Sequence, residues 1–159
     1  MKQKLFLFWL KLFLICIAVG GLAIFAFALP ALGLKMKAMN PEFSHCFWPW
    51  LIFLLISGLP CFAVLVLAGK LLSSIEKNMA FSFQNATLLK TISILAAADT
   101  AFFFAGNVVF LFLGMNHPGI LLMSLAVDFA GLTVAALFAV LSQLVRKAAE
   151  LQEQSDLTI

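Results

Sequence analysis

Two acidic residues lie inside long apolar stretches of this 159-residue chain: Asp99 follows "ILAAA" and Asp128 follows "SLAV". A charged side chain at the centre of a bilayer costs at least about 2.5 kcal/mol, so such residues usually face a bundle interior or a water-filled cavity. One chemistry for this pair is a relay for protons or cations, as in a small ion-coupled transporter. The other role is structural, because polar side chains commonly join helices within a membrane.

The sequence favours the structural role. No Lys or Arg lies within either apolar stretch to pair with the carboxylates, and the chain shows no other residues of an ion pathway. We expect each acid to be protonated or to hydrogen-bond a polar neighbour. The intramembrane polar residues in question are Asp99 and Asp128 themselves and the expected neighbours Asn107, Thr100, Ser124 and Thr133.

Patterns of catalytic and metal-binding residues are missing from the sequence. Glu42, His45, Cys46 and His117 do not have the spacing of a known metal site, and three cysteines without motif spacing predict neither a zinc site nor a disulfide framework. There is no Ser-His-Asp set, no phosphate-binding glycine loop and no His-Glu-x-x-His. We therefore predict a non-enzymatic protein with no cofactor and no metal.

The composition requires a lipid environment. Hydrophobic residues make up 64% of the chain and charged residues 11%, and a soluble domain of this size cannot bury so much apolar surface. Four runs reach the length of about 20 residues that crosses a hydrocarbon core, at residues 12–29, 48–68, 91–113 and 119–141. The runs are apolar on all sides and lack the alternation of barrel strands. The predicted fold class is all-α, an integral membrane bundle of four transmembrane helices forming one domain over residues 1–159.

The basic residues predict the orientation of the chain. Eight of them lie on one side of the four runs, and only Lys35 and Lys37 lie on the other. Because cytoplasmic loops carry the excess of Lys and Arg, both termini and the connection at residues 69–90 are predicted to be cytoplasmic. The net charge of +3 then reflects topology and attraction to anionic lipid. It gives no reason to expect direct nucleic-acid binding.

The connections between the runs differ in predicted structure. The outer segment at residues 30–47 contains two prolines and is expected to be irregular, whereas "GMNHP" at residues 114–118 predicts a tight turn and an antiparallel hairpin of the last two helices. In the inner connection, Ser82 is placed to cap a helix at Asn85. Glycines at 20, 21, 106, 114 and 131 are expected to mark close helix packing.

The cytoplasmic tail at residues 142–159 is predicted to start as an amphipathic helix. Its apolar stripe consists of Leu141, Leu144, Ala148 and Leu151. We expect the inner connection, through Phe81 and Phe83, to cover this stripe.

Two segments, "FSFQNATLLKTI" at residues 81–92 and "VLSQLVRKAAELQEQSDLTI" at residues 140–159, carry a family resemblance together with the four short spans. The chain resembles a bacterial domain-of-unknown-function family of small four-span membrane proteins that end in Asp-Leu-Thr-Ile or a close variant. Members of that family are often encoded beside a small Cro/C1-type helix-turn-helix regulator. The resemblance implies a multi-pass protein of the bacterial cell membrane and a membrane partner for a transcriptional regulator. Met79 and Ala80 depart from the family's glycine-containing turn.

The predicted function is therefore a sensing or anchoring partner of such a regulator, with a small proton- or ion-coupled transporter as the alternative. The expected partners are the lipid bilayer and the regulator, and self-association into a homo-oligomer stays open. The last residues favour extended backbone, and a free terminus can bind a partner as a strand or dock in a groove; otherwise the tail packs on its own inner loop. The predicted cytoplasmic contact surface comprises Phe81, Phe83, Asn85, Leu144, Leu151, Asp156, Leu157, Thr158 and Ile159.

Overall fold

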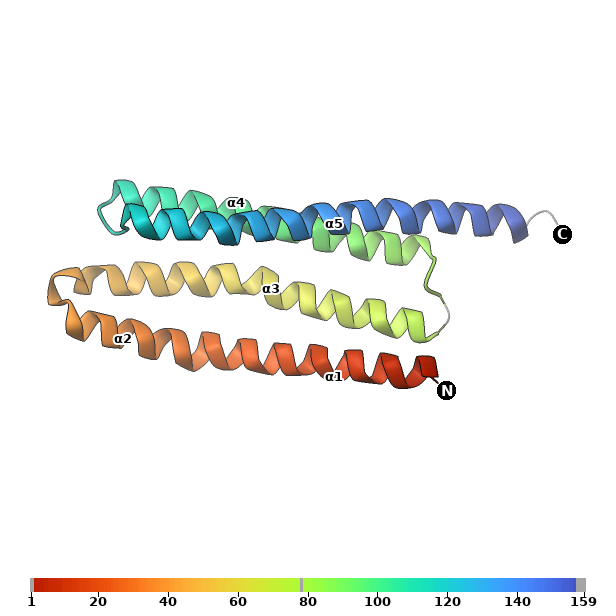
Figure 1. The fold of residues 1–159 in the computed structure, drawn as a ribbon, viewed down its shortest axis with the longest axis horizontal. Helices are drawn as coiled ribbons and strands as arrows, with labels where there is room; N and C mark the ends of the chain where they lie inside the picture. Colours follow the sequence, from red (N-terminus) through yellow and green to blue (C-terminus); the bar gives the residue numbers. More distant parts are fainter. Residues whose placement is uncertain (1, 78, 157–159) are drawn as a thin grey trace.

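Four long helical segments make up most of the protein in the computed structural model, which describes residues 2–77 and 79–156 (Figure 1). The first segment is continuous and consists of α1 (Lys2–Ala23), the π-helix η1 (Ile24–Ala28) and α2 (Leu29–Met39). The 3-10 helix η2 (Pro41–Cys46) leads into α3 (Phe47–Glu76), followed by α4 (Phe83–Phe112) and α5 (Pro118–Asp156). All four segments are long and apolar enough to cross a membrane. The predicted all-α, four-span fold class is confirmed.

The helices are longer than the apolar runs that predicted them. The run at residues 119–141, for example, lies within α5, which has 39 residues and at 1.5 Å per residue measures about 58 Å. A hydrocarbon core is only about 30 Å thick, so α5 extends well beyond the part that lipid can cover. The extension is rich in Gln, Glu, Ala and Leu, which are good helix formers in water.

The prediction of an irregular outer segment is wrong: residues 30–39 lie in α2, residues 41–46 form the 3-10 helix η2, and residue 47 begins α3. Leu29, the residue before Pro30, donates its backbone N–H to the carbonyl of Ile24, five residues earlier, at the end of the π-helix η1. A proline ring inside a regular α-helix clashes with the carbonyl four residues before it, and a π-bulge is one of the irregularities found inside otherwise regular helices. Pro30 lies in the first turn of α2. Pro41, in contrast, begins the 3-10 helix η2, two residues after α2 ends.

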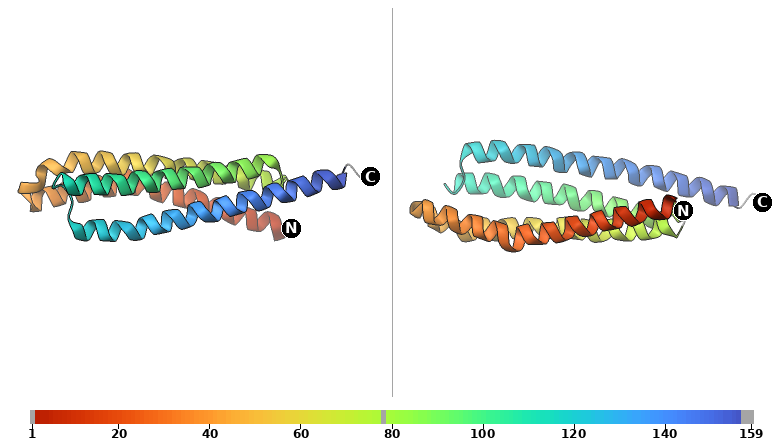
Figure 2. Two further views of the ribbon diagram at one scale, coloured as in Figure 1. Left: turned by 90° about the horizontal axis from the view of Figure 1, so that it is seen from above. Right: turned by 60° about the horizontal axis from the view of Figure 1, so that its bottom comes forward.

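The helices form two hairpins that meet through α3 and α4. α4 and α5 pack against each other along most of their length, α3 packs on α4, and α1 packs on α3. Figures 1 and 2 show the α4–α5 hairpin beside the α1–α3 hairpin, with the extension of α5 projecting past the other helices. The tight turn predicted between the last two helices is confirmed, with Met115 donating its backbone N–H to the carbonyl of Phe110 (2.8 Å).

Glycines allow the closest helix contacts in the interior. A Cβ atom built on Gly106 of α4 would lie 2.1 Å from Cε2 of Phe53 on α3, and one on Gly131 of α5 would lie 2.2 Å from Oγ1 of Thr100 on α4. The prediction of close packing is therefore confirmed at these two positions. It is wrong for Gly114, whose φ of +69° belongs to the turn after α4, and for Gly20, which has no neighbouring atom within 4 Å among the described residues.

Candidate functional site

Asp99 joins α4 to α3. Its Oδ1 accepts a hydrogen bond from Oγ of Ser57 (3.0 Å), and its Oδ2 accepts a weaker one from Sγ of Cys61 (3.8 Å). Ser57 and Cys61 are four residues apart on α3, so they lie on the same face of that helix. The half-buried acid thus has two polar partners on the neighbouring helix, which is the arrangement of an interhelical contact.

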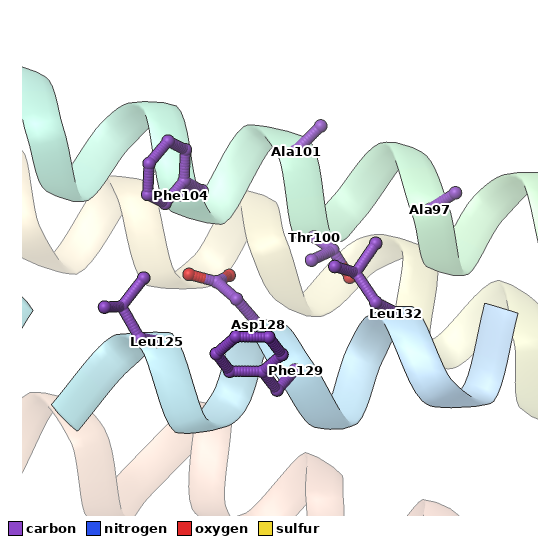
Figure 3. A pocket seen from close by; sticks show the side chains of 8 residues that line it. All are labelled: Ala97, Thr100, Ala101, Phe104, Leu125, Asp128, Phe129 and Leu132. Atoms are coloured by element: carbon purple, nitrogen blue, oxygen red, sulfur yellow. The ribbon is translucent and has the colours of Figure 1, made fainter. Parts of the chain in front are cut away.

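Asp128 lies in a different interface and has a different environment. Its side chain, on α5, is 6% exposed, and neither carboxylate oxygen has a hydrogen-bond partner among the residues that the structure describes. It lines a pocket of about 280 Å³ between α4 and α5 (Figure 3). Apart from Asp128 and Thr100, the lining side chains are apolar: Ala97, Ala101, Phe104, Leu125, Phe129 and Leu132. Asp99 does not line this pocket.

The polar neighbours expected to bond these acids are engaged elsewhere, so the alternative of a hydrogen bond to one of them is wrong, whereas protonation of the acids stays a prediction. Each hydroxyl donates to a backbone carbonyl of its own helix at 2.8 Å: Thr100 to Ala96, Ser124 to Leu121, and Thr133 to Phe129. Such a carbonyl, one turn back, is always within reach of a helical Ser or Thr. The true partners of Asp99 were missed because they lie 42 and 38 residues away on another helix, and the sequence does not reveal the register between helices.

Asn107 belongs to a network that fixes the outer turn. Its side chain is 1% exposed, and its Oδ1 and its backbone carbonyl both accept hydrogen bonds from the amide of Asn116 at 3.1 Å. From α3, Nε1 of Trp50 donates to the carbonyl of Met115 in the same turn (2.8 Å). Asn107 therefore stabilises the outer turn, and among the described residues it forms no hydrogen bond with Asp99 or Asp128.

The outer residues that were weighed as a metal site do not come together as one. Within residues 2–77 and 79–156, no group of three or more His, Cys, Asp or Glu side chains is placed to hold a metal ion. All three cysteines are free thiols.

At the other end of the molecule, Asn85 fixes the inner connection. Its amide donates hydrogen bonds to the carbonyls of Met79 (2.7 Å) and Ala80 (3.0 Å), and its backbone N–H donates to Oγ of Ser82 (3.2 Å). The predicted Ser82 cap is confirmed. Asn85 is completely buried, however, so its predicted place in an exposed contact surface is wrong. The amide of Asn85 thus holds the turn through the carbonyls of the two residues that depart from the family pattern.

The extension of α5 packs on α4 through a different face from the predicted stripe. Oγ of Ser142 donates to the carbonyl of Ala86 (2.7 Å), and Val145 is buried together with Ala86 and Leu89. Small and β-branched side chains let two helices approach closely. The leucines were predicted to form the packed face because they are the most hydrophobic residues of the extension. The smaller residues beside them make the contact with α4.

The predicted stripe is exposed, so the expectation that the inner connection covers it is wrong. Leu144 is 58% exposed and Leu151 66%, and Phe81 and Phe83 are 59% and 45% exposed. These four large apolar side chains, which we call the terminal apolar surface, all lie at the end of the molecule that carries the inner connection and the extension of α5. Asp156 is the last residue described, and Leu157, Thr158 and Ile159 lie outside the described residues.

Charged groups mark the same end of the molecule. Lys11 of α1 forms an ion pair with Glu76 of α3, and the hydrogen bond and charge of Lys11 hold the pKa of Glu76 below its usual value. Lys70 and Lys77 border a polar pocket of about 540 Å³ between α3 and α4. Ammonium groups at a membrane edge attract the phosphate groups of anionic lipids.

Comparisons with known proteins agree with a membrane location and add no activity. Residues 31–159 match a family described as protein of unknown function (DUF2975). The chain is also similar to the uncharacterized membrane protein YoaS of Bacillus subtilis (strain 168), with 31% identity over 153 residues that cover 95% of this chain and 96% of the relative. This match is long enough to include the first helical segment, most of which precedes the residues that match the family. No solved structure matches the chain.

Proposed function

Because the chain belongs to the DUF2975 family of proteins of unknown function and is a multi-pass membrane protein, we propose that it acts as a non-enzymatic membrane anchor for a cytoplasmic protein. The α5 extension and the terminal apolar surface are the proposed docking site. This proposal rests on the predicted orientation, in which both termini are cytoplasmic.

The observation that carries the proposal is the exposure of leucines on a helix that has left the membrane. The bond between Ser142 and Ala86 sets these two residues at one level, and α4 begins only three residues before Ala86. The last turns of α5 therefore pass beyond the start of α4, as Figure 1 shows. Leu144 and Leu151 are two helical turns apart on one face of this extension. Contiguous apolar surface exposed to water marks interaction sites, and these two leucines on one helix face are the candidates for such a surface.

The shape of this surface suits a partner with an apolar groove. Peptide helices commonly bind such grooves through large side chains spaced like Leu144 and Leu151, and Phe81 and Phe83 provide further apolar area at the same end of the molecule. The family resemblance suggests that the partner is a small helix-turn-helix regulator. Asp156 and the final residues Leu157, Thr158 and Ile159 complete the proposed contact.

The transporter alternative receives less support from the geometry. A pathway for protons or cations needs polar groups that line one continuous route. Asp99 is bonded to α3, whereas Asp128 lies in a separate and mainly apolar pocket between α4 and α5. The two acids are therefore not neighbours along one route in the described part of the protein.

The test is binding of a small Cro/C1-type helix-turn-helix regulator, the partner that the family resemblance suggests, to the full-length protein in lipid nanodiscs. L144A/L151A removes both leucines, and the matched control Q143A/K147A truncates two exposed side chains outside the stripe on the same helix. Burying a leucine is worth about 1.5–3 kcal/mol, so the leucine pair should weaken binding at least about tenfold, with insertion unchanged. Deleting residues 156–159 should also weaken binding. If the wild-type protein does not bind the regulator, or both pairs bind equally well, the proposal is wrong.

A further inference from the structure

Among the described residues, the carboxyl of Asp128 stands out because it is buried and both of its oxygens lack a hydrogen-bond partner. It is 6% exposed. The nearby hydroxyl of Thr100 is already donated to Ala96. An unpartnered buried polar group is destabilising. The other intramembrane acid, Asp99, avoids this cost through Ser57 and Cys61.

The walls of the pocket show what kind of group would satisfy this acid. In Figure 3 the carboxyl of Asp128 points from α5 toward α4, where Phe104 and Thr100 lie. Phe129 lines the same pocket and is 69% exposed, so it lies at the opening toward the lipid side. The site thus combines two aromatic rings and aliphatic walls with one acid, whose oxygens lie beneath the lining with almost no exposed area.

A metal ion does not fit this set of residues. Hard cations such as Ca²⁺ and Mg²⁺ take six or more oxygen ligands, whereas the pocket offers one carboxylate and one hydroxyl that is already bonded. An organic cation needs fewer oxygen contacts. Its charge can pair with the carboxylate and lie over an aromatic ring, while its hydrocarbon part contacts the aliphatic walls.

We propose that the pocket between α4 and α5 binds a small lipophilic organic cation, with Asp128 as its counter-ion. The pocket volume of about 280 Å³ is at the lower end for small-molecule sites, which are typically about 300–1,000 Å³, so the ligand is no larger than one aromatic ring with an ammonium group. Phe104 and Phe129 contact the cation or its ring. This site is independent of the proposed anchoring function, because it lies within the span and involves none of the terminal apolar surface.

The experiment measures binding of radiolabelled benzyltrimethylammonium to the full-length protein in phosphatidylcholine nanodiscs. This probe has a permanent charge, and the zwitterionic lipid does not attract it electrostatically. Saturable binding is expected, and D128N should weaken it at least tenfold. D99N is the matched control, since it makes the same substitution in the neighbouring helix and should retain binding within about twofold.

A second variant separates loss of the site from loss of the fold. A97F keeps Asp128 but fills the pocket from α4, and it should also abolish binding. Size-exclusion elution and helix content verify that each variant is folded. The proposal is overturned if the wild-type protein shows no saturable binding, if folded D128N or A97F binds like the wild type, or if D99N reduces binding as much as D128N.

Discussion

Alanine in place of Gly106 tests whether close approach of α3 and α4 holds the two hairpins together. The added Cβ would lie 2.1 Å and 2.6 Å from two ring carbons of Phe53, whereas carbon atoms in favourable contact are about 3.5–4.0 Å apart. The ring cannot simply turn away, because Phe53 is 6% exposed and its centroid lies 5.6 Å from that of Phe103 and 5.2 Å from that of Phe110. The ring or the helix must therefore move by more than about 1 Å to restore contact distances of this size.

The expected cost follows from two opposing effects. Overpacking a well-packed interior costs about 1–3 kcal/mol, and replacing Gly by Ala inside a helix returns at most about 1 kcal/mol. G106A should therefore lower the free energy of unfolding by about 1–2 kcal/mol. The control is G20A, since a Cβ on Gly20 meets no described atom within 4 Å. G20A should leave stability unchanged or raise it by up to about 1 kcal/mol.

The assay is reversible unfolding of the full-length protein in bicelles by steric trapping, with F53L as a second-site variant. F53L shortens the side chain that the added Cβ would strike. The double variant F53L/G106A should therefore lose less free energy of unfolding than the sum of the losses in the two single variants. The reasoning is refuted if G106A and G20A have the same effect, or if the two substitutions F53L and G106A are simply additive.

Two further predictions concern the end of the molecule that carries the termini. Reporter fusions after residue 159 and in the connection near Lys77 should both report the cytoplasm, because eight of the ten basic residues lie on that side; an external signal from either fusion contradicts the topology. Lys11 holds the pKa of Glu76 below its usual value, so their ion pair stabilises the folded protein above about pH 4.5 and this contribution is lost as the pH falls through the lowered pKa. The difference in stability between the wild type and E76Q should therefore shrink on acidification and at high salt, and a difference independent of both contradicts the assignment.

The number and type of the helices could be predicted from the sequence because hydrophobic length is a local property. A run such as residues 119–141 must cross the bilayer as a helix, whatever its neighbours are. The cap at Ser82 was equally local, since the side chain and the N–H that it accepts are three residues apart. The π-turn before Pro30 was missed because the sequence contains a proline but no sign of how the helix accommodates it.

The pairing of helices could not be predicted, because it depends on contacts between distant segments. Asp99 has its partner on α3 rather than among its neighbours, and no pattern in the chain sets that register. On the extension of α5, the stripe of leucines was predicted to be the face that packs on α4. In the structure, Ser142 and Val145 make that contact instead. Helices approach closely where their side chains are small, and a stripe of hydrophobic residues gives no information about side-chain size.

The uneven packing of the four helical segments has a consequence for how the protein is made. Among the described residues of α1, η1 and α2, only Leu7 is fully buried, and α1 packs on α3, which in turn packs on α4. Ribosomal synthesis delivers these segments in the order of the chain, so α1 and α3 enter the bilayer before the surface that fixes α3 exists. The closely packed α4–α5 pair is then the template on which the earlier helices settle. We therefore expect α1 and α3 to reach their final packing only after α4 and α5 have entered the bilayer.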